Sequence, residues 1–248
     1  FLCMTLPEAH GGAGADRLYS VVQMEELARG GFSGIGYGLH SEIVAPYIAH
    51  YGTEEQKARY LPKLASGEMV GAIAMSEPAA GSDLQGVRTT ALKQADGSYL
   101  INGSKTFITN GWHADLVILV AKTDPAAGAK GTSLFLIERG MPGFEKGQRL
   151  KKLGLKAQDT SELFFNNVCV GPEQLLGGTA MEGRGFICLM EQLPWERLQI
   201  AIGAVAAAQA AIDWTVAYVK DRKVFGQPVA AYQNTRYTLA ELQTEVQV

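Results

Sequence analysis

The sequence predicts an α+β fold in which a β-rich segment separates two helical ones. Apolar residues follow helical spacing over residues 16–68, change to β-branched runs with a period of two from Met69, and return to helical spacing after Gly185. Helices, then strands, then helices is the order of an α+β protein rather than of repeated βα units. We expect a partial N-terminal helical domain over 1–68, a middle β-domain over 69–175 and a partial C-terminal helical bundle over 176–248.

The N-terminal segment carries helix start and stop signals. Asp16 precedes a helical pattern and suits an N-cap, and a second helix is expected over 41–51. Thr53 opens a capping box, since a glutamine follows three residues later. The third helix should end before Pro62 or one turn later at Gly67.

The middle segment reads as short strands separated by turn residues. Asp96-Gly97 is a strong signal for a hairpin turn. Many short strands with regular turns predict a small barrel or sandwich. The expected strands are 70–76, 87–93, 99–102, 105–109, 116–122, 133–138 and 162–168.

A long alanine-rich helix is expected over 194–222, about 43 Å in length. Pro194 suits the first helical position, which would put Glu196 in the first turn. The final segment also favours a helix but stops at Val248 without a cap, and Phe1 is no initiator, so the chain looks cut at both ends.

Composition excludes several classes of function. A net charge of −3 gives no basic field for nucleic acid, and no uninterrupted apolar run reaches the length of a membrane span. The three cysteines are widely spaced, which favours a reducing compartment over a disulfide framework. The four histidines show no metal-ligand spacing, so we expect no metal.

The run over residues 74–86 is the most informative motif. An apolar stretch ends there in a polar turn with small residues, which lets backbone N–H groups and hydroxyls approach a ligand. A second apolar segment, 107–111, also ends in polar residues. The first run resembles a signature of the acyl-CoA dehydrogenases at Ala74, Met75, Ser76, Glu77, Ala80, Gly81, Ser82, Asp83 and Gly86.

The resemblance implies a β-barrel domain between helical parts, FAD as cofactor and acyl-CoA as substrate. Ser76 and Thr109 would place hydroxyl donors beside the flavin, with the ring of Phe107 behind it, where hydrogen bonds stabilise the charge that grows on the ring. The absence of a Rossmann fingerprint agrees with this family. The implied cofactor-binding residues in this region are Ile73, Ala74, Met75, Ser76, Gly81, Ser82, Phe107, Ile108 and Thr109.

Three further residues are implied to bind the FAD of a neighbouring subunit, namely Arg222, Phe225 and Gln233. Taken alone, the basic cluster at Arg222 is more typical of a solvated helix end. The resemblance instead implies a homo-oligomer, with a tetramer expected, and an electron-transferring flavoprotein as the electron acceptor. The compartment would be the cytoplasm of a bacterium or the mitochondrial matrix of a eukaryote.

Glu196 is the candidate catalytic base. Taken alone, its position favours a surface glutamate stabilised by a helix dipole. In long-chain and isovaleryl members of the family the matching glutamate is the base, whereas other members carry the base on a segment that would lie beyond Val248. The substrate-binding residues implied are Ser82, Pro194 and Arg197.

Two questions stay open from the sequence. The glycine-rich stretch over 33–38 is either a flexible helix start or space for a long acyl chain. The chain is most similar to the long-chain type of dehydrogenase, but an acyl-CoA oxidase or flavin monooxygenase on the same fold, or a non-catalytic flavin- or acyl-CoA-binding protein, is an alternative.

Overall fold

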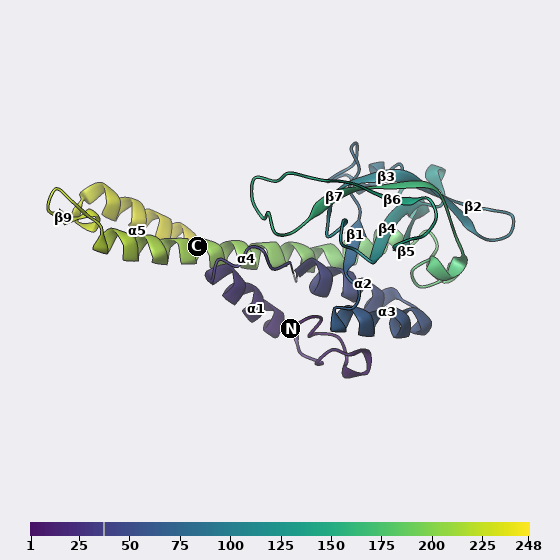
Figure 1. The fold of residues 1–248 in the computed structure, drawn as a ribbon, viewed down its shortest axis with the longest axis horizontal. Helices are drawn as coiled ribbons and strands as arrows, with labels where there is room; N and C mark the ends of the chain where they lie inside the picture. The colour runs from purple at the N-terminus through teal and green to yellow at the C-terminus, as the bar shows by residue number, and fades with distance from the viewer. Residues whose placement is uncertain (37) are drawn as a thin grey trace. The chain divides into compact units, whose positions relative to one another are not determined.

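The computed structural model describes residues 1–36 and 38–248, and it confirms the predicted order of helices, strands and helices (Figure 1). Tyr37, within the glycine-rich stretch, lies outside the described residues. Contacts divide the chain into two compact units, 1–17 with 34–196 and 18–33 with 197–248, which we call the sheet unit and the helical unit. The division into three domains stays a prediction.

The third predicted helix begins and ends at its predicted signals, whereas the second, expected over 41–51, begins two residues earlier. A π-helical segment, Leu39–Val44, leads into α2 (Ala45–Tyr51), and α3 follows over Glu54–Ser66. Thr53 forms the predicted capping box with Gln56 through reciprocal hydrogen bonds of 3.2 and 3.0 Å. Pro62 lies inside α3, and Gly67 ends the helix with a φ of 79°, so the later of the two expected ends is confirmed.

Seven strands form one sheet in the order β1-β4-β2-β3-β7-β6, with β5 paired to β4. β1 lies parallel to β4, while β5 runs antiparallel to β4 along its whole length. The strands are β1 (Gly71–Ala74), β2 (Thr90–Lys93), β3 (Tyr99–Thr109), β4 (Leu116–Lys122), β5 (Thr132–Glu138), β6 (Phe144–Arg149) and β7 (Thr160–Val170).

Two strand predictions need correction. The expected strands 99–102 and 105–109 are one strand, β3, whose pairing with β7 shifts at Gly103 and again between Lys105 and Ile108. The residues between the two expected strands therefore form a β-bulge rather than a turn. β6 was not predicted, because only its first residue, Phe144, is a large apolar one. The hairpin at Asp96-Gly97 is confirmed, since β2 and β3 pair antiparallel across it.

Strand β4 carries the core of the sheet unit. All seven of its residues are buried. Leu116, Ile118 and Val120 pack into a core that includes Leu61 of α3, whereas the alternating residues Val117, Leu119 and Ala121 pack against β3, β5 and β7. Burial on both faces explains the continuous aliphatic run of its first six residues, and the seventh, Lys122, is buried with its ammonium donating to the carbonyl of Gly128.

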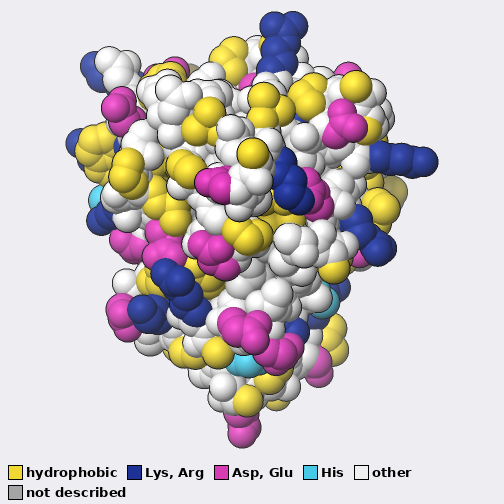
Figure 2. Space-filling model, turned by 90° about the vertical axis from the view of Figure 1, so that its right-hand side faces the viewer, with side chains coloured by type: hydrophobic (Ala, Val, Ile, Leu, Met, Phe, Trp, Pro, Cys, Tyr) yellow, Lys and Arg dark blue, Asp and Glu magenta, His cyan; other side chains and the backbone are white. Residues whose placement is uncertain are grey.

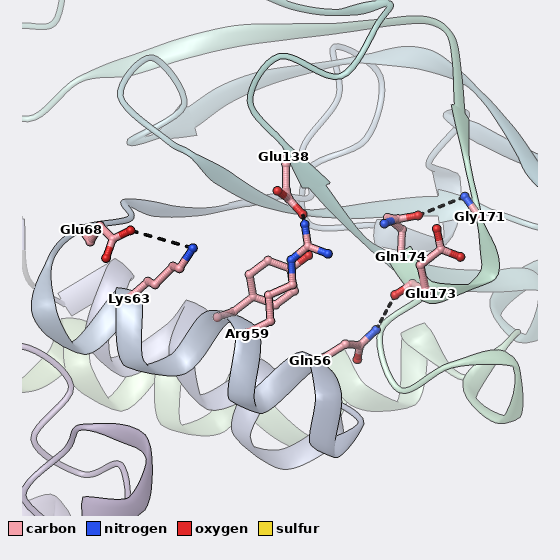
Figure 3. Close-up of polar contacts among 9 residues, drawn as sticks. Gln56, Arg59, Lys63, Glu68, Glu138, Gly171, Glu173 and Gln174 are labelled. Atoms are coloured by element: carbon pink, nitrogen blue, oxygen red, sulfur yellow. Dashed lines mark hydrogen bonds and ion pairs between the residues drawn. The ribbon is translucent and has the colours of Figure 1, made fainter.

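Polar contacts fix α3 to the sheet (Figure 3). Arg59 and Tyr60 both reach the carboxylate of Glu138 at the end of β5, at 2.6 and 2.7 Å. One turn earlier, the Gln56 amide donates to the carbonyls of Glu173 and Leu175. The same residue that caps α3 therefore also ties the helix to the loop after β7.

The surface mixes both signs of charge. Figure 2 shows lysine and arginine side chains interspersed with aspartate and glutamate over the face that it presents. Surface ion pairs of this kind include Lys93 with Glu182 at 3.0 Å and Lys63 with Glu68 at 3.8 Å. Exposed pairs contribute about 0–1 kcal/mol each, so they add little to the stability of the fold.

The long helix begins earlier than predicted. α4 spans Gly185–Asp221, so Pro194 lies inside the helix and Glu196 lies about three turns from its start rather than in the first turn. Proline lacks the N–H that would bond to the carbonyl of Met190. Packing offsets this loss, because Cys188 and Leu189 belong to the buried core.

Beyond α4 come the hairpin strands β8 (Lys223–Val224) and β9 (Gln227–Pro228) and the helix α5 (Gln233–Gln247). The helical unit also contains most of α1 (Arg17–Arg29), which begins directly after Asp16 as expected.

The composition of α4 qualifies the expectation of no membrane span. An 18-residue window of this helix has a mean hydropathy of 1.5, so by length and composition alone the helix is able to cross a membrane. Alanine-rich packing helices of soluble proteins pass the same test, and the observation is therefore weak evidence for a membrane.

His40 joins three elements of the sheet unit. Its Nδ1 accepts a hydrogen bond from the N–H of Gly71 in β1, at 3.0 Å. Since an N–H can only donate, Nε2 carries the ring hydrogen and donates it to the carbonyl of Leu64 in α3, at 2.8 Å. Burial lowers the pKa of His40, against an opposing effect of the hydrogen bond to Leu64.

We predict that His40 makes stability depend on pH. Because its pKa is lowered on folding, the unfolded chain binds more protons as pH falls below about 6.5, and stability is lost in that window and retained above it. Urea unfolding at pH 5.5 and 7.5 should show a smaller loss on acidification for His40→Asn than for the parent. His113→Asn, at an exposed ring, is the matched control. An equal loss in the parent and in His40→Asn would contradict the prediction.

Candidate active site

The two predicted motifs lie side by side in the sheet unit. The N–H of Thr106 in β3 donates to the carbonyl of Ser76, just beyond the end of β1, at 2.9 Å. The Asn110 amide donates to the carbonyl of Gly71, at the start of β1, at 3.3 Å. Thr109 lies three residues after Thr106 in β3, past the bulge at Phe107. Ser76 and Thr109 therefore lie at separate points along the line where β1 passes β3.

The predicted residues of these motifs divide by exposure. Ile73, Ala74 and Ile108 are buried in the core, so only their backbone groups are available to a ligand. Met75, Ser76 and Thr109 are half-buried.

Phe107 is 70% exposed and has a φ of 59°, which is unusual for a residue with a bulky side chain. The bulge at this point of β3 turns the aromatic ring out of the sheet.

The turn after β1 is open on one side. Gly81 and Ser82 are exposed, and Asp83 caps a short 3-10 turn by accepting from the N–H of Gln85 at 3.1 Å. A Cβ at Gly81 would meet no atom within 4 Å, and the φ of Gly81 lies outside the left-handed region. Neither strain nor packing within the chain therefore requires a glycine here, and the open space next to the exposed Ser82 fits the flavin that the resemblance implies.

A buried ion pair lies beneath this turn. The Lys105 ammonium is 2.8 Å from a Glu77 carboxylate oxygen, and their side chains are 0% and 5% exposed. Burial lowers the pKa of Lys105 to about 8, although Glu77 acts in the opposite direction. Burial alone would raise the pKa of Glu77, but Lys105 and hydrogen bonds from Thr89 and Arg88 lower it overall. The sequence analysis missed Lys105, which sits in an expected strand with nothing to mark it as buried.

Glu196 lies on the part of α4 that belongs to the sheet unit and is half-buried. It lies close to Tyr47 of α2, whose side chain is fully buried. Burial raises the pKa of Tyr47, and the charge of Glu196 raises it further. Because Glu196 is not in the first turn, the helix dipole does not account for this carboxylate, and its environment is a partly desolvated one.

The other predicted residues of α4 and the hairpin lie outside this arrangement. Pro194 and Arg197 are exposed on α4. Within the helical unit, Arg222 directly follows α4 and Gln233 is the first residue of α5. Phe225 lies between β8 and β9, is 95% exposed and has a φ of 51°. The hairpin therefore displays an aromatic side chain between Arg222 and Gln233.

Family profiles match the chain along nearly its whole length. The N-terminal domain of acyl-CoA dehydrogenases matches residues 1–68, the middle domain 72–168 and the C-terminal domain 183–248. The chain belongs to the acyl-CoA dehydrogenase family. The middle-domain match contains both strand-end motifs, and the C-terminal match contains Glu196.

Relatives in this family act on different acyl groups by name. The mitochondrial long-chain specific acyl-CoA dehydrogenase of Mus musculus is 51% identical over 247 residues, covering 99% of this chain and 56% of that protein. The mitochondrial isovaleryl-CoA dehydrogenase of Oryza sativa is 44% identical over 245 residues, covering 98% and 59%. A crystal structure of an acyl-CoA dehydrogenase from Geobacillus kaustophilus is 51% identical with a TM-score of 0.94, covering 99% of this chain and 64% of that one. The chain thus spans somewhat more than half the length of the curated relatives.

We predict that Gly81→Val separates ligand binding from folding in this member of the acyl-CoA dehydrogenase family. A Cβ at this exposed position meets no protein atom within 4 Å, so the free energy of unfolding of the apoprotein should stay within about 0.5 kcal/mol of the parent. FAD should bind about tenfold more weakly, or worse, because the side chain fills space that the ligand needs. Urea unfolding and an FAD titration of the same preparations test both parts. Unchanged FAD affinity would show that Gly81 does not face the cofactor.

Proposed function

We propose that the protein is an FAD-dependent acyl-CoA dehydrogenase that converts an acyl-CoA into a trans-2-enoyl-CoA. The observation that carries the proposal is that the open turn at Gly81 follows β1 at Ser76, whose carbonyl is hydrogen-bonded to β3, the strand that carries Thr109 and the outward ring of Phe107. Family membership and relatives named as dehydrogenases support it. A long-chain substrate is favoured by the mouse relative, which has a higher identity than the isovaleryl enzyme.

Glu196 is proposed as the base that removes a proton from the carbon next to the thioester carbonyl. FAD, when bound, accepts the hydride from the next carbon. The substrate thus loses one proton and one hydride, and a double bond forms between the two carbons. Glu196 is half-buried on α4 close to the enclosed side chain of Tyr47, so it is partly withdrawn from bulk water, as a base acting on an apolar substrate needs to be.

The remaining residues have proposed positioning roles. Ser76 and Thr109 would hold the flavin by hydrogen bonds, with support from Met75, Phe107 and nearby backbone groups. Ser82, Pro194 and Arg197 would contact the substrate.

Arg222, Phe225 and Gln233 would hold the FAD of a neighbouring subunit in a homotetramer, which agrees with the exposure of Phe225. An electron-transferring flavoprotein is the proposed acceptor, in bacterial cytoplasm or the mitochondrial matrix.

We predict that Glu196→Gln abolishes reduction of bound flavin by substrate while leaving the flavin in place. In anaerobic stopped-flow experiments on the full-length protein with acyl-CoA thioesters of graded chain length, the rate of flavin bleaching should fall by about 10²–10⁴-fold. Glu191→Gln is the matched control, because Glu191 lies on the same helix and is exposed to solvent. Its carboxylate accepts a hydrogen bond from the Tyr51 hydroxyl. The rate of this variant should stay within about twofold of the parent, as expected for a surface substitution.

The same experiment distinguishes the alternatives. A flavin- or acyl-CoA-binding protein without turnover would show no bleaching in the parent. An oxidase or monooxygenase would bleach but be reoxidised rapidly on admission of air, whereas a dehydrogenase would be reoxidised slowly. Bleaching that survives in Glu196→Gln would assign the base to another residue.

A further inference from the structure

The buried pair of Glu77 and Lys105 makes more contacts than an ion pair needs. Besides its bond to Glu77, the Lys105 ammonium donates to the carbonyl of Met75 at 3.0 Å. Met75 directly precedes Ser76, whose own carbonyl accepts from the N–H of Thr106. The backbone on both sides of the Ser76 side chain is therefore held by β3.

The Glu77 carboxylate holds the far end of the same turn. One oxygen accepts from the N–H of Arg88 at 2.6 Å, and the other from the N–H of Thr89 at 3.0 Å. Glu77 also exchanges backbone hydrogen bonds with Ala80, at 2.8 and 3.1 Å. The segment from 77 to 89, which contains Gly81 and Ser82, thus starts and ends on one carboxylate.

Lys105 also fixes β3 close to Phe107. It lies in β3 two residues before Phe107, at the point where the pairing with β7 shifts. Because its ammonium is anchored inside, the strand cannot slide without breaking the contacts to Glu77 and Met75. Phe107, whose backbone is left-handed, therefore lies two residues after an anchored lysine.

We propose that the Glu77–Lys105 pair is a positioning device that places Ser76, the turn around Gly81 and Phe107 in one arrangement for the flavin. The inference rests on the proposed function, because it assigns these residues to a flavin site. The lowered pKa of Glu77 agrees with a carboxylate that stays charged to accept its donors. Neither side chain reaches the ligand; both act through the backbone that they hold.

The test compares three variants of the full-length protein. Glu77→Gln and Lys105→Met each leave one charge buried without its counterpart, which threatens folding. The double variant removes both charges and avoids that problem, so it carries the decision. Lys93→Met is the matched control, since it breaks a lysine–glutamate pair of the same sheet unit in which Lys93 is exposed and Glu182 is half-buried.

FAD affinity and the visible circular dichroism of bound flavin are measured together with urea unfolding of the apoprotein. We expect the double variant to bind FAD about tenfold more weakly, as for loss of one or two good hydrogen bonds, and with an altered dichroism spectrum. Lys93→Met should keep the parent affinity and spectrum. A purely structural role would lower the urea midpoint but leave the affinity and spectrum of the folded protein unchanged.

The outcomes separate this inference from the proposed function. Parental affinity and spectrum in a folded double variant would overturn the positioning role while leaving the dehydrogenase proposal intact. Failure of the parent itself to bind FAD would overturn the proposed function and this inference with it.

Discussion

Burial of β4 on both faces is the constraint from which the sheet unit follows. One set of its side chains faces the core that includes α3, and the alternating set faces the strands around it. With β5 on one edge and β1 on the other, its backbone groups are also paired within the sheet. The pairing with β4 fixes where β1 ends. The polar turn that follows β1 therefore begins next to β3, to which Ser76 is hydrogen-bonded. The candidate site is built at a strand end because aliphatic side chains fill both faces along most of β4.

Much of this arrangement is encoded locally and was predictable. The reciprocal bonds between Thr53 and Gln56 need only four residues of sequence, and the Asp96-Gly97 turn needs two. β4 could be predicted because a short, uninterrupted aliphatic run bounded by polar residues is typical of a strand buried on both faces. The strand-end motifs were found through small residues and hydroxyls in sequence, and the structure places them next to each other.

The features that were missed depend on contacts between distant residues. β6 is a polar edge strand whose conformation is set by pairing with β7 rather than by its own residues. Local preference put Pro194 at a helix start, but tertiary packing of Cys188 and Leu189 extends α4 back to Gly185. Lys105 is a charged residue in a strand, and only the fold shows that Glu77 meets it inside. Its burial is the least predictable property of the site and the one that orders it.

That burial has a chemical consequence for a protein that would work on acyl thioesters. Thioesters acylate amines only in the unprotonated form, and burial, which lowers the pKa of Lys105, makes that form easier to reach than in an ordinary lysine. An acyl donor that entered this part of the protein would therefore find a reactive amine. Because the side chain is completely enclosed and its hydrogens are engaged by Glu77 and Met75, the nucleophile is kept out of reach.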